Sequence, residues 1–133
     1  MLTELVLKEL ELTKADDLIG WCYSNLSWER IAALAKLVYE AVRQGDEVAK
    51  AILDMSVEGL ESSISAVIRK VQFGEDEPFP IVFAGGNLTF SGSLLAAELT
   101  TVLKSKYPNC NIVYPSVEPV EAAALIAKQF ANK

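Results

Sequence analysis

The sequence contains no histidine and only two cysteines among its 133 residues. The lack of histidine excludes the commonest zinc ligand, the commonest general base and any catalytic triad that depends on histidine. Cys22 and Cys110 lie far apart, and neither belongs to a Cys-x-x-Cys pattern. The two thiols therefore indicate a reducing compartment rather than a disulfide framework.

Basic residues are also few: 12 lysines and arginines stand against 18 aspartates and glutamates, for a net charge of −6. A surface that binds nucleic acid needs clustered cations, so this balance argues against a nucleic-acid partner. No apolar run approaches the roughly 20 residues of a membrane-spanning helix. The first residues, MLTELVLKELEL, carry acids where a signal peptide has a basic segment. We therefore expect a cytoplasmic protein with no membrane partner.

What the sequence does contain is enough apolar material for one core. At 133 residues, 51% of them hydrophobic, the chain predicts a single domain over 1–133. The hydrophobic pattern divides it into a helical part over 1–73 and a β-α-β-α part over 80–133. Two strands joined by a helix form a parallel pair. The predicted fold class is thus α/β, rich in helix, with a short parallel strand pair flanked by helices.

The helical part begins with two short amphipathic segments. Apolar spacing predicts a helix over 2–11. Residues 13–16, TKAD, have the form of a capping box that starts a second helix, which ends near Cys22. Residues 21–26 are expected to form a loop. Three aromatic residues at this point indicate a packing or interface role, or else a platform for a sugar ring: Trp21, Tyr23 and Trp28.

Two longer helices come next. Ser27 is the expected N-cap of the first, which runs to about Gln44; Gly45 ends it, and Asp46 caps the next helix, which continues to about Val71. The two should pack as an antiparallel hairpin. Expected buried positions in the first are Ile31, Leu34, Ala35, Val38 and Val42. Those in the second are Val48, Ile52, Met55, Leu60, Ile64, Val67 and Val71. The cations of these helices are expected on solvated faces: Lys36, Arg43, Lys50, Arg69 and Lys70.

The second half alternates strand and helix. After an acidic loop over 74–80, continuous apolar runs predict buried strands over 81–84 and 111–114. A helix over 91–106 connects them, and Ser116 is the expected cap of a last helix. Expected buried positions are Leu94, Leu95, Leu99 and Val102 in the connecting helix, Cys110 beside the second strand, and Val120, Ala123, Ala124, Ala127 and Phe130 in the last helix. The acids of the loop indicate solvent exposure rather than a cation site: Glu75, Asp76 and Glu77.

Two adjacent glycines, Gly85 and Gly86, stand where the first strand ends. Ligands of open α/β sheets bind at this edge, and the missing side chains let the backbone approach a base or a phosphate closely. Small polar residues come after them at Asn87, Thr89, Ser91 and Ser93. The alternative is a tight turn that needs glycine only for its backbone conformation. The segment matches neither Gly-x-Gly-x-x-Gly nor the P-loop.

Four segments of the chain resemble the BadF/BadG/BcrA/BcrD-type ATPase family, and within it the N-acetylglucosamine-kinase-like members. They are LTELVLKELELTKADDLIGWCYSN at 2–25, RIAALAKLVYEAVRQGDEVAKAIL at 30–53, PIVFAGGNLTFSGSLL at 80–95 and YPSVEPVEAAALIA at 114–127. Together they cover nearly the whole chain in the family's order. The family belongs to the actin, hexokinase and heat-shock-70 superfamily. The resemblance therefore implies the C-terminal part of an actin-like, ribonuclease-H-like second lobe.

In this family the strand-Gly-Gly-helix segment is the adenosine motif. The resemblance implies that Ala84, Gly85, Gly86 and Asn87 line the adenine and ribose side of a site for ATP or ADP with Mg²⁺. Family members often carry glycine at the start of the last helix, where this chain has Ala122. That difference puts the approach of this helix to the nucleotide in doubt.

The catalytic parts of such kinases are absent from the sequence. The resemblance implies an N-terminal phosphate-binding hairpin, a second glycine-rich hairpin and an aspartate that acts as base on the sugar hydroxyl. The one pair of neighbouring aspartates, Asp16 and Asp17, is predicted to be a solvated helix start. We therefore expect no catalytic residue and no metal ligand in this chain. Whether it serves an active ATP-dependent sugar kinase stays open.

Two functions of different classes are compatible with these features. The first is the nucleotide-binding half-lobe of an N-acetylglucosamine-kinase-like sugar kinase, which stays inactive until a missing N-terminal lobe supplies the groups that phosphoryl transfer needs. The alternative is a truncated module with no nucleotide function, whose unpaired sheet edge is covered by a homodimer.

Overall fold

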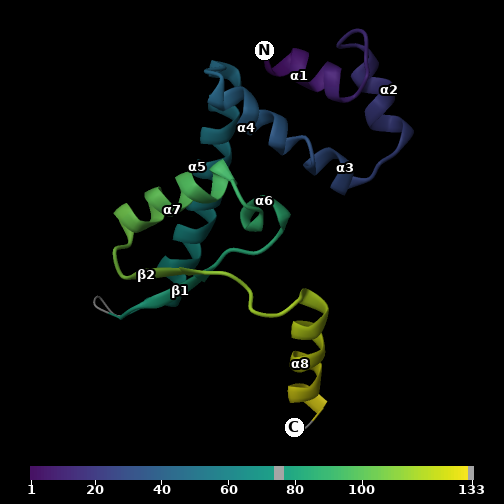
Figure 1. Ribbon diagram of the computed structural model, residues 1–133. Helices are drawn as coiled ribbons and strands as arrows, with labels where there is room; N and C mark the ends of the chain where they lie inside the picture. Colours follow the sequence, from purple (N-terminus) through teal and green to yellow (C-terminus); the bar gives the residue numbers. More distant parts are fainter. Residues whose placement is uncertain (74–76, 132–133) are drawn as a thin grey trace.

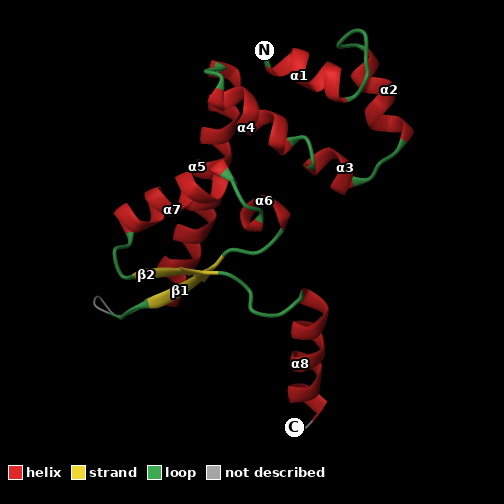
Figure 2. Cartoon of the chain, in the orientation of Figure 1, coloured by secondary structure: helices red, strands yellow, loops and turns green. Residues whose placement is uncertain are grey.

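A computed structural model describes residues 1–73 and 77–131, which form eight helices and two strands (Figures 1 and 2). The elements in chain order are α1 (Leu2–Glu9), α2 (Asp17–Ser24), α3 (Trp28–Ala32), α4 (Ala35–Arg43), α5 (Glu47–Val71), β1 (Phe79–Val82), α6 (Gly86–Thr89), α7 (Leu94–Lys106), β2 (Cys110–Val113) and α8 (Pro119–Ala131). Glu75 and Asp76 of the expected acidic loop lie outside the described residues. No helix among those described is both long and apolar enough to cross a membrane.

The two strands form a parallel pair in which Phe79 lies opposite Cys110. Alternate residues of each strand point toward α5 and α7, which cover one face of the pair (Figure 1). On the other face Val82 is 57% exposed. The α/β class, the richness in helix and the short parallel pair are confirmed. Each strand begins earlier than expected: β1 by two residues and β2 by one.

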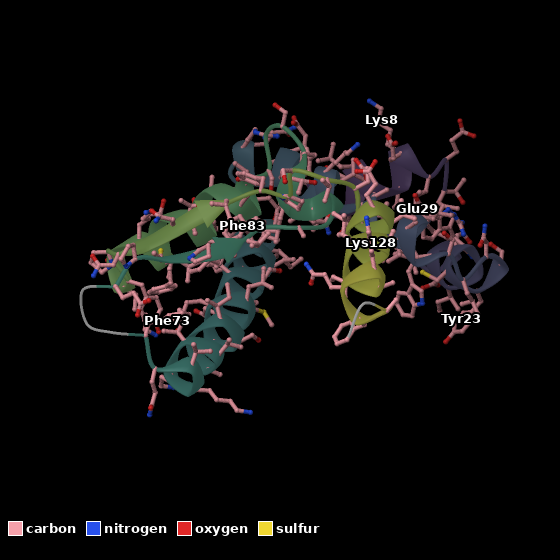
Figure 3. All side chains as sticks on the ribbon, turned by 90° about the horizontal axis from the view of Figure 1, so that it is seen from below. Lys8, Tyr23, Glu29, Phe73, Phe83 and Lys128 are labelled. Carbon is pink, nitrogen blue, oxygen red and sulfur yellow. The ribbon has the colours of Figure 1, made fainter. Side chains whose placement is uncertain are left out.

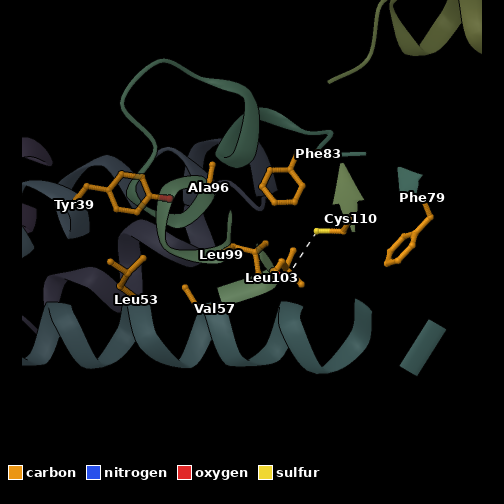
Figure 4. Close-up of a cluster of buried hydrophobic side chains, with 9 residues drawn as sticks. All are labelled: Tyr39, Leu53, Val57, Phe79, Phe83, Ala96, Leu99, Leu103 and Cys110. Carbon is orange, nitrogen blue, oxygen red and sulfur yellow. Dashed lines mark hydrogen bonds between the residues drawn. The ribbon is translucent and has the colours of Figure 1, made fainter. Parts of the chain in front are cut away.

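The core is a seam of apolar side chains between α5, α7 and the strands (Figure 4). Leu99 and Leu103 of α7 are completely buried at its centre, with Phe83 and Cys110 beside them. The cluster consists of Tyr39, Leu53, Val57, Phe79, Phe83, Ala96, Leu99, Leu103 and Cys110. The expectation that Cys110 is a buried small residue is confirmed. In α7, Leu99 is buried as expected, whereas Val102 is 38% exposed, because the inward face falls on Ala96, Leu99 and Leu103.

The inward face of α5 differs from the expected one. Leu53 is buried, and Leu60, Ile64 and Ile68 pack against the core, whereas Met55 is 72% exposed. Leu60 and Ile64 were expected inside; the other expected positions are exposed, namely Val48, Ile52, Met55, Val67 and Val71. The helix carries two apolar stripes, and the stripe that faces α4 and α7 is the one that is buried.

The region before α4 is more helical and more broken than expected. Residues 21–24 continue α2 and are not a loop, and the single helix expected from Ser27 is divided into α3 and α4. At the break the amides of Leu34 and Leu37 donate to the carbonyls three residues back, at 3.1 and 2.9 Å. This tighter winding turns the chain between the two helices. Ser27 accepts a bond from the amide of Arg30, so its role as N-cap is confirmed.

The expected capping box at residues 13–16 does not form. The side chain of Asp17 accepts bonds from the Thr13 hydroxyl at 3.0 Å and the Lys14 amide at 3.2 Å. These bonds close a turn ahead of α2, and Asp16 makes no capping bond with its side chain. The polar pattern therefore marks the right place, but a different residue carries the bonds.

The junction between α4 and α5 is as expected. Gly45 adopts φ +83°, and the amides of Gly45 and Asp46 bond back to α4 at 3.0 Å, which ends the helix. The Asp46 carboxylate then caps α5 by accepting from the amide of Ala49 at 2.9 Å. The same carboxylate accepts from the amide of Leu2 at 2.8 Å. One side chain thus fixes α1 to the start of α5.

The last helix is the element that departs most from expectation. It begins at Pro119, and the carbonyl of the preceding residue, Glu118, accepts from the Ala122 amide at 3.0 Å. The helix therefore starts too far along the chain for Ser116 to be its cap. Pro119 in the first turn is as expected. None of its residues is buried, so the expected inner face is wrong in this chain. In Figure 1, α8 extends away from the strands. Its large exposed apolar residues are Val120, Leu125, Ile126 and Phe130.

Protonation of Asp46 should weaken the junction of α1 and α5. Bonds from the amides of Ala49 and then Leu2 hold the pKa of this carboxyl below its ordinary value of 3.8. A carboxyl with a lowered folded pKa contributes stability above its unfolded pKa and loses it as the pH falls through the folded pKa. Below about pH 4 the melting temperature of the wild type should therefore fall more steeply than that of Asp46→Asn. Parallel acid declines in the two proteins would contradict this role.

The inward face of α5 can be checked with two neighbouring residues. Leu53→Ala should lower the free energy of unfolding by about 2–5 kcal/mol, because Leu53 is 3% exposed and its loss leaves a cavity. Met55→Ala is the matched control and should change it by less than about 0.5 kcal/mol. Urea denaturation of the two variants measures the difference. Equal losses in the two variants would contradict the assignment of Leu53 to the inward face and Met55 to the outward one.

Candidate functional site

The chain turns sharply after β1 through Gly85. Gly85 has φ +91° and ψ 149°, a backbone conformation that residues other than glycine rarely adopt. Its carbonyl accepts from the amides of Leu88 and Thr89 at 3.0 and 3.1 Å and from the Thr89 hydroxyl at 3.1 Å. These bonds form α6, a short helix that the sequence did not indicate. The first glycine is therefore required by the backbone.

A cleft of about 610 Å³ opens where the two strands end. The last bond between the two chain segments runs from the amide of Phe83 to the carbonyl of Val113 at 2.9 Å, and beyond it they separate. One wall is made by Ala84, Gly85, Gly86 and Thr89; the other is made by Tyr114, Pro115, Ser116, Val117, Glu118, Pro119 and Glu121. This is the carboxyl edge of the parallel pair, where ligands bind in α/β sheets.

A second hollow, of about 460 Å³, shares Gly86 with this cleft. It lies between α6 and the helical part, and its remaining lining residues are Glu29, Ala32, Ala33, Lys36, Asn87 and Phe90. The four expected site residues are thus divided. Ala84, Gly85 and Gly86 line the cleft, whereas Gly86 and Asn87 line the hollow. Gly86 is the point that both spaces have in common.

Gly86 itself leaves room at this point. An ideal Cβ built on it meets no atom within 4 Å, and its φ is not positive. Neither packing nor backbone conformation demands a glycine here. What the missing side chain does provide is open backbone facing two spaces, which is the requirement for a flat ligand to approach closely.

The charges around the two spaces are few. Glu118 and Glu121 are the charged residues of the cleft wall, while Glu29 and Lys36 line the hollow. No lysine or arginine lines the cleft, so it suits an uncharged ligand whose hydroxyls can donate to carboxylates. Among the described residues, no group of three or more His, Cys, Asp or Glu side chains could hold a metal ion.

Sequence reasoning assigned no binding residue to the second wall of the cleft, although the resemblance placed the start of the last helix near the nucleotide. Tyr114 to Glu121 come directly after β2 and carry no glycine pair to mark them. The signal was topological: the carboxyl ends of two parallel strands meet at one edge, so the segment after the second strand must face the segment after the first. Of the small polar residues after the glycines, Thr89 lines the cleft, while Ser93 is buried.

The other residues considered from the sequence lie elsewhere. Trp21 stacks under the Arg30 guanidinium at 3.6 Å and lines a separate groove, whereas Trp28 is 82% exposed. Tyr23 lies at the far end of the helical part from Phe83 (Figure 3). The structure does not gather these three aromatic residues around one hollow. Among the described cations, Arg43 is not simply solvated, since it donates to the Gly92 carbonyl at 3.1 Å.

The two glycines should respond differently to alanine. Gly85→Ala should lower the free energy of unfolding by about 1–3 kcal/mol, because alanine is strained at this backbone conformation. Gly86→Ala should leave it unchanged or raise it by up to about 1 kcal/mol, because the site is open and helical. Urea denaturation of both variants tests this. Equal destabilisation would show that Gly86 also has a structural role.

Comparisons with known proteins show what this chain is similar to. The model of the BadF/BadG/BcrA/BcrD ATPase family matches residues 7–127. An N-acetyl-D-glucosamine kinase of Dictyostelium discoideum is 37% identical over 128 residues, which are 95% of this chain and 40% of that protein. An N-acetylmuramic acid/N-acetylglucosamine kinase of Clostridium acetobutylicum is 28% identical over 124 residues, 92% of this chain and 40% of that protein. No solved structure shows a significant match.

The chain therefore spans about two fifths of the length of these relatives. The family match includes both walls of the cleft and the helices that carry the hollow. The resemblance noted in four separate segments of the sequence is thus confirmed over nearly the whole chain. This protein belongs to the BadF/BadG/BcrA/BcrD ATPase family.

Proposed function

We propose that this chain is the nucleotide-binding half-lobe of an N-acetylglucosamine-kinase-like sugar kinase. The adenine and ribose of ATP or ADP, bound with Mg²⁺, would lie against Ala84, Gly85, Gly86 and Asn87. The observation that carries this proposal is the open backbone of Gly86 at the carboxyl edge of the strands, in a chain of an ATPase family. The whole chain would act as one domain, in which the β-α-β-α unit of residues 80–133 forms both walls of the cleft and the helices of residues 1–73 border the hollow.

The charges suggest which end of the nucleotide this chain holds. Glu118 and Glu121 would repel phosphates but can accept bonds from ribose hydroxyls, and Lys36 borders the hollow on the other side of Gly86. We therefore assign the adenosine end to this chain. The phosphates and Mg²⁺ would be held by groups of the missing lobe, because phosphoryl transfer requires cations and metal around the transferred group.

The proposed partner is that N-terminal lobe. The apolar side chains of α8 are exposed, among them Val120 and Leu125, and the free face of the strands is exposed at Val82. Surfaces of this kind are usually covered by another part of the protein. The chain accounts for 40% of the length of relatives named as kinases of N-acetylglucosamine. We infer that the complete protein phosphorylates a sugar of this class.

Calorimetric titration of the purified chain with Mg²⁺–ADP tests the nucleotide site. We expect saturable binding in the micromolar to low-millimolar range, and loss of binding in Gly86→Val, whose side chain would occupy the approach to the backbone. Gly59→Val is the matched control, since Gly59 is also helical, with nothing within 4 Å of an added Cβ, but lies on α5. Sugar phosphorylation should appear when the part of the Dictyostelium relative outside the match is supplied.

Two results would contradict the proposal. The first is the absence of binding heat at several-millimolar Mg²⁺–ADP. The two glycines would then serve only to form the turn and would bind no nucleotide. The second is undiminished binding by Gly86→Val, which would move the site elsewhere. Stable self-association without nucleotide binding, measured by sedimentation equilibrium, would favour the stand-alone module.

A further inference from the structure

The turn that presents Gly86 has little structure of its own. The helix α6 has four residues, Gly86 to Thr89, and its end is closed by a bond from the Phe90 amide to the Gly86 carbonyl at 3.2 Å. So short a helix is marginal by itself. Its position must therefore be fixed by neighbouring elements.

Ser93 connects this turn to α7. Its hydroxyl donates to the carbonyl of Asn87 at 2.6 Å and accepts from the amide of Ala96 at 3.1 Å, as the N-cap of α7. Its own amide donates to the Phe90 carbonyl at 3.3 Å. One residue thus holds two points of the turn and the first turn of a helix that lies in the core. Ser93 is 8% exposed, so water has little access to these bonds.

The other end of the turn is held by the helical part. The ring of Phe90 stacks on Tyr39 at 5.8 Å between centroids, and the Lys36 ammonium lies 5.9 Å above it. Arg43, also on α4, donates to the carbonyl of Gly92. The segment from Phe90 to Ser93 is therefore fixed to α4 and to α7. The bond from Ser93 to Asn87 transmits that position to the residues beside Gly86.

We propose that Ser93 is a positioning residue of the nucleotide site. It does not line the cleft or the hollow that Gly86 faces. By holding the Asn87 carbonyl it fixes the backbone against which a base would stack. Removal of the hydroxyl should let the turn move while the core seam of α5 and α7 remains, because Leu99 and Leu103 are untouched.

The test compares Ser93→Ala with Ser93→Thr, which keeps a hydroxyl, and with Ser65→Ala. Ser65 is the matched control: it is also a buried serine, but it bonds to Glu61 and Tyr107 at the opposite end of α7. At a temperature where all variants are folded, Ser93→Ala should raise the Kd for Mg²⁺–ADP at least about fivefold. Ser93→Thr and Ser65→Ala should bind like the wild type.

Amide hydrogen exchange over residues 86–90 provides a second readout that needs no nucleotide. The affinity arm rests on the proposed function, whereas this arm does not. Faster exchange in Ser93→Ala, with wild-type exchange in Ser65→Ala, supports the positioning role even if the wild type binds no nucleotide. The absence of nucleotide binding by the wild type would overturn the proposed function alone. Equal exchange and equal affinity in Ser93→Ala and Ser65→Ala would overturn the positioning role.

Discussion

Burial of α7 between α5 and the two strands is the constraint on which this structure depends. Leu99 and Leu103 are completely covered because the long helix lies on one side and the strands on the other. Two four-residue strands cannot form a stable sheet unaided. They stay paired because Phe79, Phe83 and Cys110 insert into the same seam. The carboxyl edge of the strands, and with it the cleft, takes its position from this packing.

Features set by local chemistry could be predicted from the sequence. Gly45 and Asp46 end one helix and start the next through bonds within a few residues, and Ser27 caps α3 in the same way. The Gly85–Gly86 turn could be recognised because two adjacent glycines directly after an apolar run mark the end of a strand. The family resemblance then supplied the ligand class, which geometry alone does not name.

Features set by tertiary contacts could not be predicted in the same way. The choice between the two apolar stripes of α5 depends on which side α4 and α7 approach, and Met55 is as apolar as Leu53. No residue of the second cleft wall was assigned, because strand pairing brings Tyr114 to Glu121 to Gly85 over a long sequence separation. The inner face expected for α8 depended on tertiary packing, and none of the residues of this helix is buried.

The proline in β1 has a consequence for how the free edge behaves. The Phe83 amide points to β2, and alternate residues of a strand face opposite edges, so the nitrogen of Pro80 faces the outer edge, where it has no hydrogen to donate. An incoming strand would find a gap in the row of donors, as at the guarded edges of natural sheets. Pro80 therefore disfavours the addition of a further strand at the outer edge of β1, and with it fibril-like stacking.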